Sequence, residues 1–354
     1  MARKNRVVLR DAVYHVTSHV VNDARLLASD EFKERIAGWI YGVAAFSGVE
    51  VYAWSIQDSA LHLVVRAPSV PREYWTDSAI DPASYAFGMR PAENRVQRWS
   101  PNGDRPQPPP LRPVLGFMLD DEQMLSRLNS LYGSSERTER TRKEWRRLRG
   151  DGMGWMVDAE KEKYARRMYN LSQFTKTLKE RIAMVYNRER RREGSFWRGR
   201  FHSQLLEDDA KVRALVAAFG DLAAVRAKAA SSPSEYAWCS FGRAGMGVEH
   251  SEACRHGYER LLGCDWASAK AKMEAVFALR PRNSGSLDDL PDDGVVGVAD
   301  ALRGSPAAFT KSVYVGCDRE KAKAMFSELP KDFPCASWRR ALRVWGRLDW
   351  GAVA

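Results

Sequence analysis

The strongest constraint on the fold is the change of hydrophobic period within about the first seventy residues. Residues 14–21 (YHVTSHVV) alternate apolar and polar side chains, which is typical of a strand. Apolar residues then recur at helical spacing between a cap at Ser29 or Asp30 and a stop at Gly48. The stretches VEVYAWSIQ and ALHLVVRAP follow as two strands joined by a tight turn. This part of the chain is predicted to run strand, helix, strand, strand.

A second series of elements begins near residue 171. Apolar residues mark one face of a long helix that ends near Asn187, and a basic run with a glycine turn leads to a strand near residues 200–206. Asp208 is predicted to cap the next helix, whose apolar stripe includes Leu215 and Phe219. The order of all these elements predicts an α+β fold with a ferredoxin-like βαββαβ core.

Two segments fall outside this order. Residues 69–158 hold the proline-rich stretch SPNGDRPQPPPLRP, a short helix near residues 119–132 and the charged stretch SSERTERTRKEWRRLRG. We expect a large insertion with flexible parts, and a solvated linker is the alternative. Residues 241–354 are expected to form an additional, mostly helical C-terminal region, in which SWRRALRVWGRLDW predicts a basic amphipathic helix. Residues 1–240 then form one domain that the insertion interrupts.

The charge of the chain indicates the kind of partner. A net charge of +11 and a pI near 9.5 favour a polyanion such as nucleic acid. The sequence has no apolar run of the roughly 18 residues that a membrane span needs, and its start lacks the apolar core of a signal peptide. We therefore expect a cytoplasmic protein without a membrane partner.

The cysteines and their neighbours give no metal motif. Five cysteines, an odd number with no CxxC pair, lie in the last third of the chain and are expected to be free thiols in a reducing compartment. His250, Cys254 and His256 are close together, but their spacing matches no usual zinc motif and a fourth ligand is missing. No metal or other cofactor is predicted.

Four stretches carry a resemblance to a known family. They are YHVTSHVVN, VEVYAWSIQDSALHLVVRAP, LKERIAMVYNRERRREGSFWRGRFHSQLLED and FGDLAAVRA, and GSFWRGRFHS is the most distinctive part. In order and spacing they resemble the single-tyrosine HUH transposases, and within them the REP-associated tyrosine transposases of the IS200-like group. The resemblance covers about residues 7–240. It implies an HUH endonuclease-like core for the transposase-like domain.

The resemblance also implies a degenerate active site. In such enzymes two histidines of a His-hydrophobic-His triplet hold a divalent ion, and a tyrosine on the last helix attacks the phosphate of single-stranded DNA. Here the triplet aligns with Ala60-Leu61-His62, Phe219 takes the tyrosine's place, and Ala223 stands where the family has an asparagine. His62 is then the remnant of a site without catalytic residues, and Ala60, His62 and Phe219 are expected to face one pocket.

A basic cluster coincides with the segment that handles DNA in this family. Guanidinium groups suit phosphates, and a tryptophan could stack on a base. The expected contacts with nucleic acid are Arg188, Arg190, Arg191, Arg192, Trp197, Arg198 and Arg200.

The sequence thus predicts a domesticated, catalytically inactive transposase-like protein that binds DNA, as a hairpin or single strand, or structured RNA. Two alternatives stay open. One is an active transposase that nicks and joins single-stranded DNA with another tyrosine, best Tyr186, and with Mg²⁺ or Mn²⁺ as cofactor. The other is a protein-interaction subunit of a nucleoprotein complex, with the insertion or the C-terminal region binding a protein partner.

Overall fold

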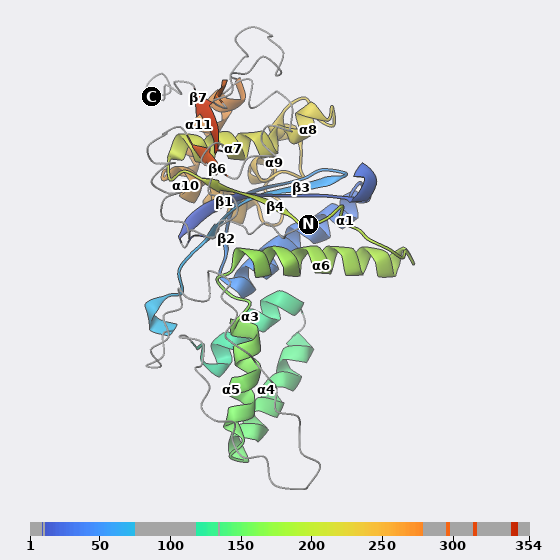
Figure 1. The fold of residues 1–354 in the computed structure, drawn as a ribbon, viewed down its shortest axis with the longest axis vertical. Helices are drawn as coiled ribbons and strands as arrows, with labels where there is room; N and C mark the ends of the chain where they lie inside the picture. Colours follow the sequence, from blue (N-terminus) through green and yellow to red (C-terminus); the bar gives the residue numbers. More distant parts are fainter. Residues whose placement is uncertain are drawn as a thin grey trace.

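A seven-stranded mixed sheet forms the centre of the molecule, with helices on both faces (Figure 1). The computed structural model describes residues 9, 11–74, 118–133, 135–278, 295–297, 314–316 and 341–345. The strand order is β2-β3-β1-β4-β6-β7-β5. The strands are β1 (Ala12–His19), β2 (Glu50–Ile56), β3 (Ala60–Ala67), β4 (His202–Leu206), β5 (Val295–Gly297), β6 (Tyr314–Gly316) and β7 (Ala341–Trp345).

The first four strands are the ones that the sequence predicts. β1 pairs antiparallel with β3 and with β4, and β2 pairs antiparallel with β3. Helix α1 (Asp30–Ser47) connects β1 to β2, and α6 (Leu171–Glu189) precedes β4. The chain is therefore a mixed α+β protein, as expected.

The ends of the predicted helices agree with the sequence except at one cap. Ser29 caps α1, and Gly48 ends it at a φ of 71°, a conformation that favours glycine. The helix after β4, α7 (Ala210–Asp221), is capped by Asp209, whose side chain accepts from the amide of Lys211. The prediction of Asp208 as the cap is wrong, because that carboxylate binds Arg213 at the surface instead.

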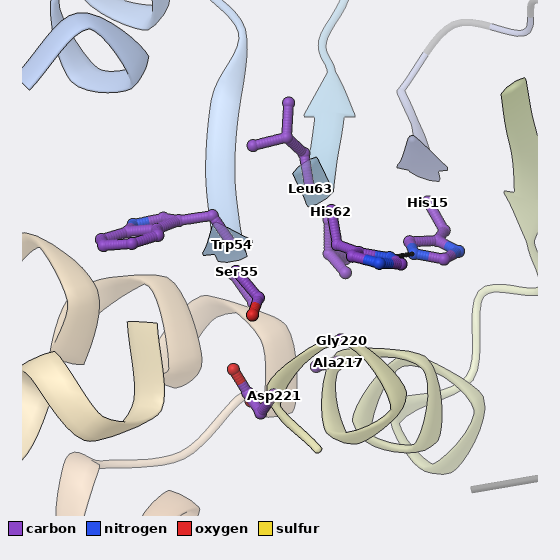
Figure 2. A pocket seen from close by; sticks show the side chains of 10 residues that line it. His15, Trp54, Ser55, His62, Leu63, Ala217, Gly220 and Asp221 are labelled. Carbon is purple, nitrogen blue, oxygen red and sulfur yellow. Dashed lines mark hydrogen bonds between the residues drawn. The ribbon is translucent and has the colours of Figure 1, made fainter. Parts of the chain in front are cut away.

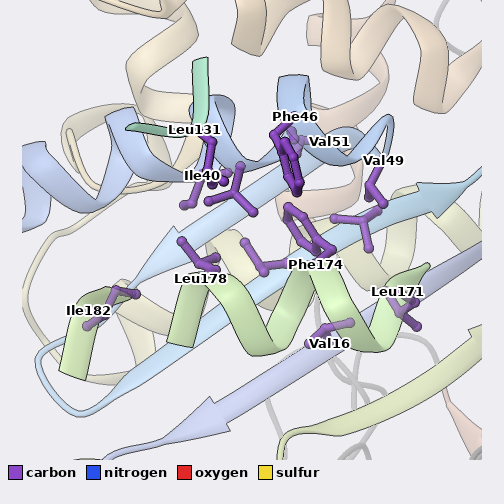
Figure 3. Close-up of a cluster of buried hydrophobic side chains, with 14 of the residues drawn as sticks. Val16, Ile40, Phe46, Val49, Val51, Leu131, Leu171, Phe174, Leu178 and Ile182 are labelled. Carbon is purple, nitrogen blue, oxygen red and sulfur yellow. The ribbon is translucent and has the colours of Figure 1, made fainter. Parts of the chain in front are cut away.

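One face of the sheet packs against α1 and α6. Figure 3 shows side chains of this cluster, with Val16 of β1, Ile40 and Phe46 of α1, and Phe174 and Leu178 of α6 together. All five are buried. This layer places α6 and the basic segment that follows it on the side of the sheet opposite to α7.

The other face packs against α7 and the helices that follow it. These are α8 (Ala223–Arg226), α9 (Ser240–Met246), α10 (Ser251–Leu262) and α11 (Trp266–Ala278). Tyr52 of β2, Phe219 of α7 and Tyr258 of α10 belong to one buried cluster. Helices beyond residue 240 therefore share a core with the sheet, and the domain boundary at that point stays a prediction.

The charged part of the insertion is helical, which argues against the alternative of a solvated linker for this part. Helices α3 (Asp121–Tyr132), α4 (Ser135–Gly150) and α5 (Gly154–Ala165) lie beyond α1 and α6 in Figure 1. Although α4 is mostly charged, it buries Trp145, whose indole N–H donates to Glu160 over 2.9 Å. Burial of this large aromatic side chain stabilises the packing of α4 against α5. The charge pattern of the segment alone does not predict this packing. The proline-rich stretch lies outside the described residues.

The far C-terminal region contains strands. Residues 341–345, predicted to lie in an amphipathic helix, form β7 between β6 and β5, with parallel pairing on both sides. That helix is wrong for these residues, because pairing with two neighbours in the sheet overrides a weak helical period. Among the described residues of this region, those from 240 to 278 contain the expected helices, and the three short segments beyond them are strands.

We expect Gly257→Ala to lower the free energy of unfolding by about 1–3 kcal/mol or more, as overpacking does. A Cβ atom at Gly257 of α10 would meet the backbone carbonyl of Tyr52 in β2. The matched control is Gly245→Ala, because Gly245 is exposed in α9 with nothing within 4 Å of an added Cβ. Chemical denaturation measures both variants, and equal stabilities would contradict the packing of α10 on β2.

Candidate functional site

Polar side chains gather on the face of the sheet that α7 covers. Strand register and the alternation of side chains place the following residues on this face: His15, Thr17 and His19 of β1, Ala60 and His62 of β3, and His202 and Gln204 of β4. Of these residues, Ala60 and His62 were predicted from the sequence as site positions, and the other five were not. The alternation of His15, Thr17 and His19 within β1 was the signal that could have revealed them.

His15 and His62 form a buried pair (Figure 2). His15 Nε2 lies 3.3 Å from His62 Nδ1, and the two rings are stacked. His15 Nδ1 lies 2.7 Å from Oε1 of Gln204. Because an amide oxygen only accepts, His15 donates from Nδ1 and accepts at Nε2 from His62. This arrangement satisfies two neutral imidazoles.

Burial keeps both rings neutral at pH 7. Loss of solvation lowers the pKa of His15 to about 4, although the bond to Gln204 opposes this. The pKa of His62 falls well below its usual value, first because of burial and then because of the charges of His15 and Arg226. The surroundings of this histidine pair therefore disfavour protonation of either ring.

Phe219 closes this site. Its ring meets His15 and His62 edge-on, with ring centres 6.0 Å apart in each case, and it is 0% exposed. The guanidinium of Arg226 lies 4.2 Å from the centre of the same ring. The structure thus brings His62 and Phe219 together.

The other two positions of the expected site lie further off. Ala60 shares the face but pairs with His19 at the end of β3 and does not line the cavity beside His62. Ala223 begins α8 and is nearly buried. Of the three residues expected to face one pocket, only His62 lines this cavity, and Phe219 contacts the His62 ring without lining it.

The cavity beside His62 is too small for a ligand. Its volume is about 10 Å³, at the lower limit for one water molecule. Asp221 also lines it, and burial raises the pKa of this carboxyl to about 7. The Asp221 side chain accepts from the Tyr258 hydroxyl over 2.5 Å. This bond links α7 to α10 in the core. A scissile phosphate has no room here.

No set of three or more metal-ligating side chains occurs in the part of the chain that the structure describes. Near His250, the Cys254 thiol contacts the Tyr41 hydroxyl at 3.2 Å in the interior, whereas His256 is exposed beside Glu259. Cys317 and Cys335 lie outside the described residues. Among those residues, no helix has the length and apolar character needed to cross a membrane.

We expect the imidazole signals of His15 and His62 to stay in the neutral form between pH 5 and 8. A lowered pKa means that the unfolded chain binds these protons while the folded one does not, so the pair destabilises the fold as the pH falls from about 6.5 towards 4. NMR titration of the histidines measures this directly. Exposed His256, whose pKa Glu259 raises, is the internal control that should titrate.

Tyr186 does not share a site with His62. It lies on α6 with ring centres 5.4 Å from Phe32 and 5.1 Å from Phe196, in the layer on the opposite face of the sheet. A nucleophile there cannot reach a phosphate held at the histidine pair. The geometry therefore gives no support to the alternative that uses Tyr186.

The basic cluster lies where α6 ends. Arg188, Arg190 and Arg191 are exposed and form no ion pair among the described residues, although Arg188 and Arg190 lie near enough to Glu189 to interact with its charge. Arg192 instead holds the turn, because its guanidinium donates to the Asn187 side chain and to the Ser195 carbonyl.

The rest of the cluster runs back along α6 towards β4. Arg198 pairs with Asp23 over 3.1 Å, and Arg200 is exposed. Trp197 is only 8% exposed and donates its indole N–H to the Lys179 carbonyl. Its ring packs in the core and offers no open face to a base, which corrects its expected stacking role.

Comparison with known proteins adds one weak similarity. No family model and no curated protein matches the chain. A solved structure, described as a REP-associated tyrosine transposase bound to a REP hairpin, aligns with 69% of this chain and 85% of its own. The identity is 11% and the TM-score is 0.32. Values this low do not establish a common fold, so membership in the family stays a prediction.

Proposed function

We propose that this protein binds structured nucleic acid and does not cleave it. The observation that carries the proposal is the exposed turn at the end of α6, where Arg188, Arg190 and Arg191 form no ion pair in the described part of the chain and the nearby Glu189 pairs with Arg35. Guanidinium groups without acidic partners can bind phosphates without first breaking ion pairs. The net charge of +11 attracts the same kind of ligand.

Catalytic inactivity is the second part of the proposal. Phe219 has no hydroxyl, its ring is fully buried, and the cavity beside His62 has a volume of about 10 Å³. His15 and His62 use ring nitrogens on each other and are neutral. A divalent ion prefers several oxygen or nitrogen ligands in fixed geometry, which this pair does not supply.

The proposal includes a domesticated HUH transposase origin with a ferredoxin-like core in residues 1–240. The strand order β2-β3-β1-β4 with antiparallel neighbours supports it, because it is the order of a split βαβ unit. A cytoplasmic location belongs to the same proposal. The ligand is a DNA hairpin, single-stranded DNA or structured RNA.

Equilibrium binding to a labelled DNA hairpin at several salt concentrations tests this function. We expect saturable binding whose affinity falls as salt rises, because each phosphate contact releases a counterion. A structured RNA hairpin of the same length compares the two ligand classes. Absence of binding to either ligand at low salt would overturn the proposal and favour a protein-interaction role.

A further inference from the structure

A groove of about 420 Å³ lies along α6, on the side of the sheet away from the histidine pair. Its volume is within the range of about 300–1,000 Å³ that is typical of small-ligand sites. Residues of α6 form one wall and the segment that returns to β4 forms the other. The lining residues are Ser172, Gln173, Lys176, Lys179, Glu180, Ala183, Trp197, Arg200 and Phe201.

Two hydrogen bonds fix the walls of the groove relative to each other. The indole N–H of Trp197 donates to the Lys179 carbonyl over 2.9 Å. In return, the Lys179 ammonium donates to the Gly199 carbonyl over 2.8 Å and lies 5.0 Å from the centre of the Trp197 ring. These two bonds hold α6 and the segment that returns to β4 together at the groove.

The lining combines apolar and cationic groups. Ala183 is apolar, the largely buried rings of Trp197 and Phe201 reach the wall only with their edges, and the aliphatic stems of the lysines extend this surface. At the rim, Arg200 is exposed, and the Lys176 ammonium lies 3.8 Å from the Glu180 carboxylate. The Lys179 ammonium is buried and already donates to the Gly199 carbonyl, so Arg200 is the main cation of the rim. A flat apolar ring with a phosphate attached complements such a lining.

We propose that this groove binds one unpaired nucleotide of the nucleic acid, with its base against the apolar walls and its phosphate at the cationic rim. The inference rests on the proposed function and deepens it. Ala183 and Arg190 are seven positions apart, or about 10 Å along a helix axis. A stacked strand rises about 3.4 Å per nucleotide along its axis, so about three nucleotides cover this length. The groove and the basic turn therefore serve one continuous strand.

Two tryptophan substitutions on neighbouring positions of α6 separate the groove from the rest of the surface. Ala183→Trp fills the groove while all present core side chains are kept. Met184→Trp is the matched control, because Met184 is 62% exposed and does not line the groove. Circular dichroism and thermal unfolding check that both variants are folded.

The probes are a DNA hairpin with a short single-stranded tail and the same hairpin with an abasic tail, which keeps every phosphate. Wild-type protein and Met184→Trp should bind the tail with bases about tenfold more tightly than the abasic tail, because the base buries apolar surface against the walls of the groove. Ala183→Trp should bind both probes with the affinity that the wild type has for the abasic one.

The outcomes distinguish the two proposals. If wild-type protein binds both probes equally, the groove has no role in base binding, although the proposed function stands. If Ala183→Trp retains the preference for bases, the bases bind elsewhere and the inference is overturned. If the wild type binds neither probe, the proposed function fails together with the inference.

Discussion

Replacing Arg188, Arg190 and Arg191 together with alanine is expected to weaken binding to every hairpin or single-stranded ligand at least about tenfold at 0.15 M salt. Three exposed guanidinium groups that form no ion pair among the described residues are lost at once. The slope of log affinity against log salt should become shallower by about 2–3, because each phosphate contact contributes about 0.7–0.9. Fluorescence anisotropy with a labelled hairpin measures both quantities.

A second triple variant controls for net charge. Replacing Arg142, Arg147 and Arg166 with alanine removes the same charge from the helices of the insertion, where each of these side chains already pairs with glutamate. We expect its affinity to change much less. Equal losses in the two triple variants would show that only total charge matters, and the basic turn would then not be the binding surface.

Replacing Phe219 with alanine should lower the free energy of unfolding by about 3–5 kcal/mol, as removal of a fully buried phenylalanine does. The ring is 0% exposed and contacts two imidazoles and the Arg226 guanidinium. Its loss would also leave a cavity beside three polar groups. Urea denaturation monitored by circular dichroism measures the change.

Phe277→Ala provides the comparison for this variant, because Phe277 of α11 is only partly buried in the same cluster. Its replacement should lower the free energy of unfolding by less. A loss at Phe219 no larger than that at Phe277 would mean that Phe219 is accessible rather than sealed. In that case Phe219→Tyr with Ala60→His could present a hydroxyl to DNA. The closed geometry instead predicts that this double variant stays inactive.

The elements with strong periodicity could be predicted from sequence. The strands and helices up to residue 67, and those from residue 171 to α7, follow alternation, helical stripes and caps such as Ser29 and Gly48. These signals are local. The pairing partners of β6 and β7 depend on contacts between distant segments, so a helical pattern at residues 341–345 could not exclude a strand.

The candidate site, too, could be predicted only as far as patterns within single strands allow. Alternation places Ala60 and His62 on one face of β3, but the partner that uses His62 is His15, which lies 47 residues earlier. Only strand register brings them together. In the same way, Arg190 is exposed, whereas Arg192 holds the turn and Trp197 is buried. The sequence of the basic segment does not show which of its side chains are exposed.

The most direct test of binding without cleavage uses one sample and two gels. Wild-type protein is incubated with an end-labelled single-stranded hairpin DNA and Mn²⁺, and then run under native and denaturing conditions. We predict a shifted band on the native gel and full-length, protein-free DNA on the denaturing gel. A shortened product or a protein-linked label on the denaturing gel would contradict the account.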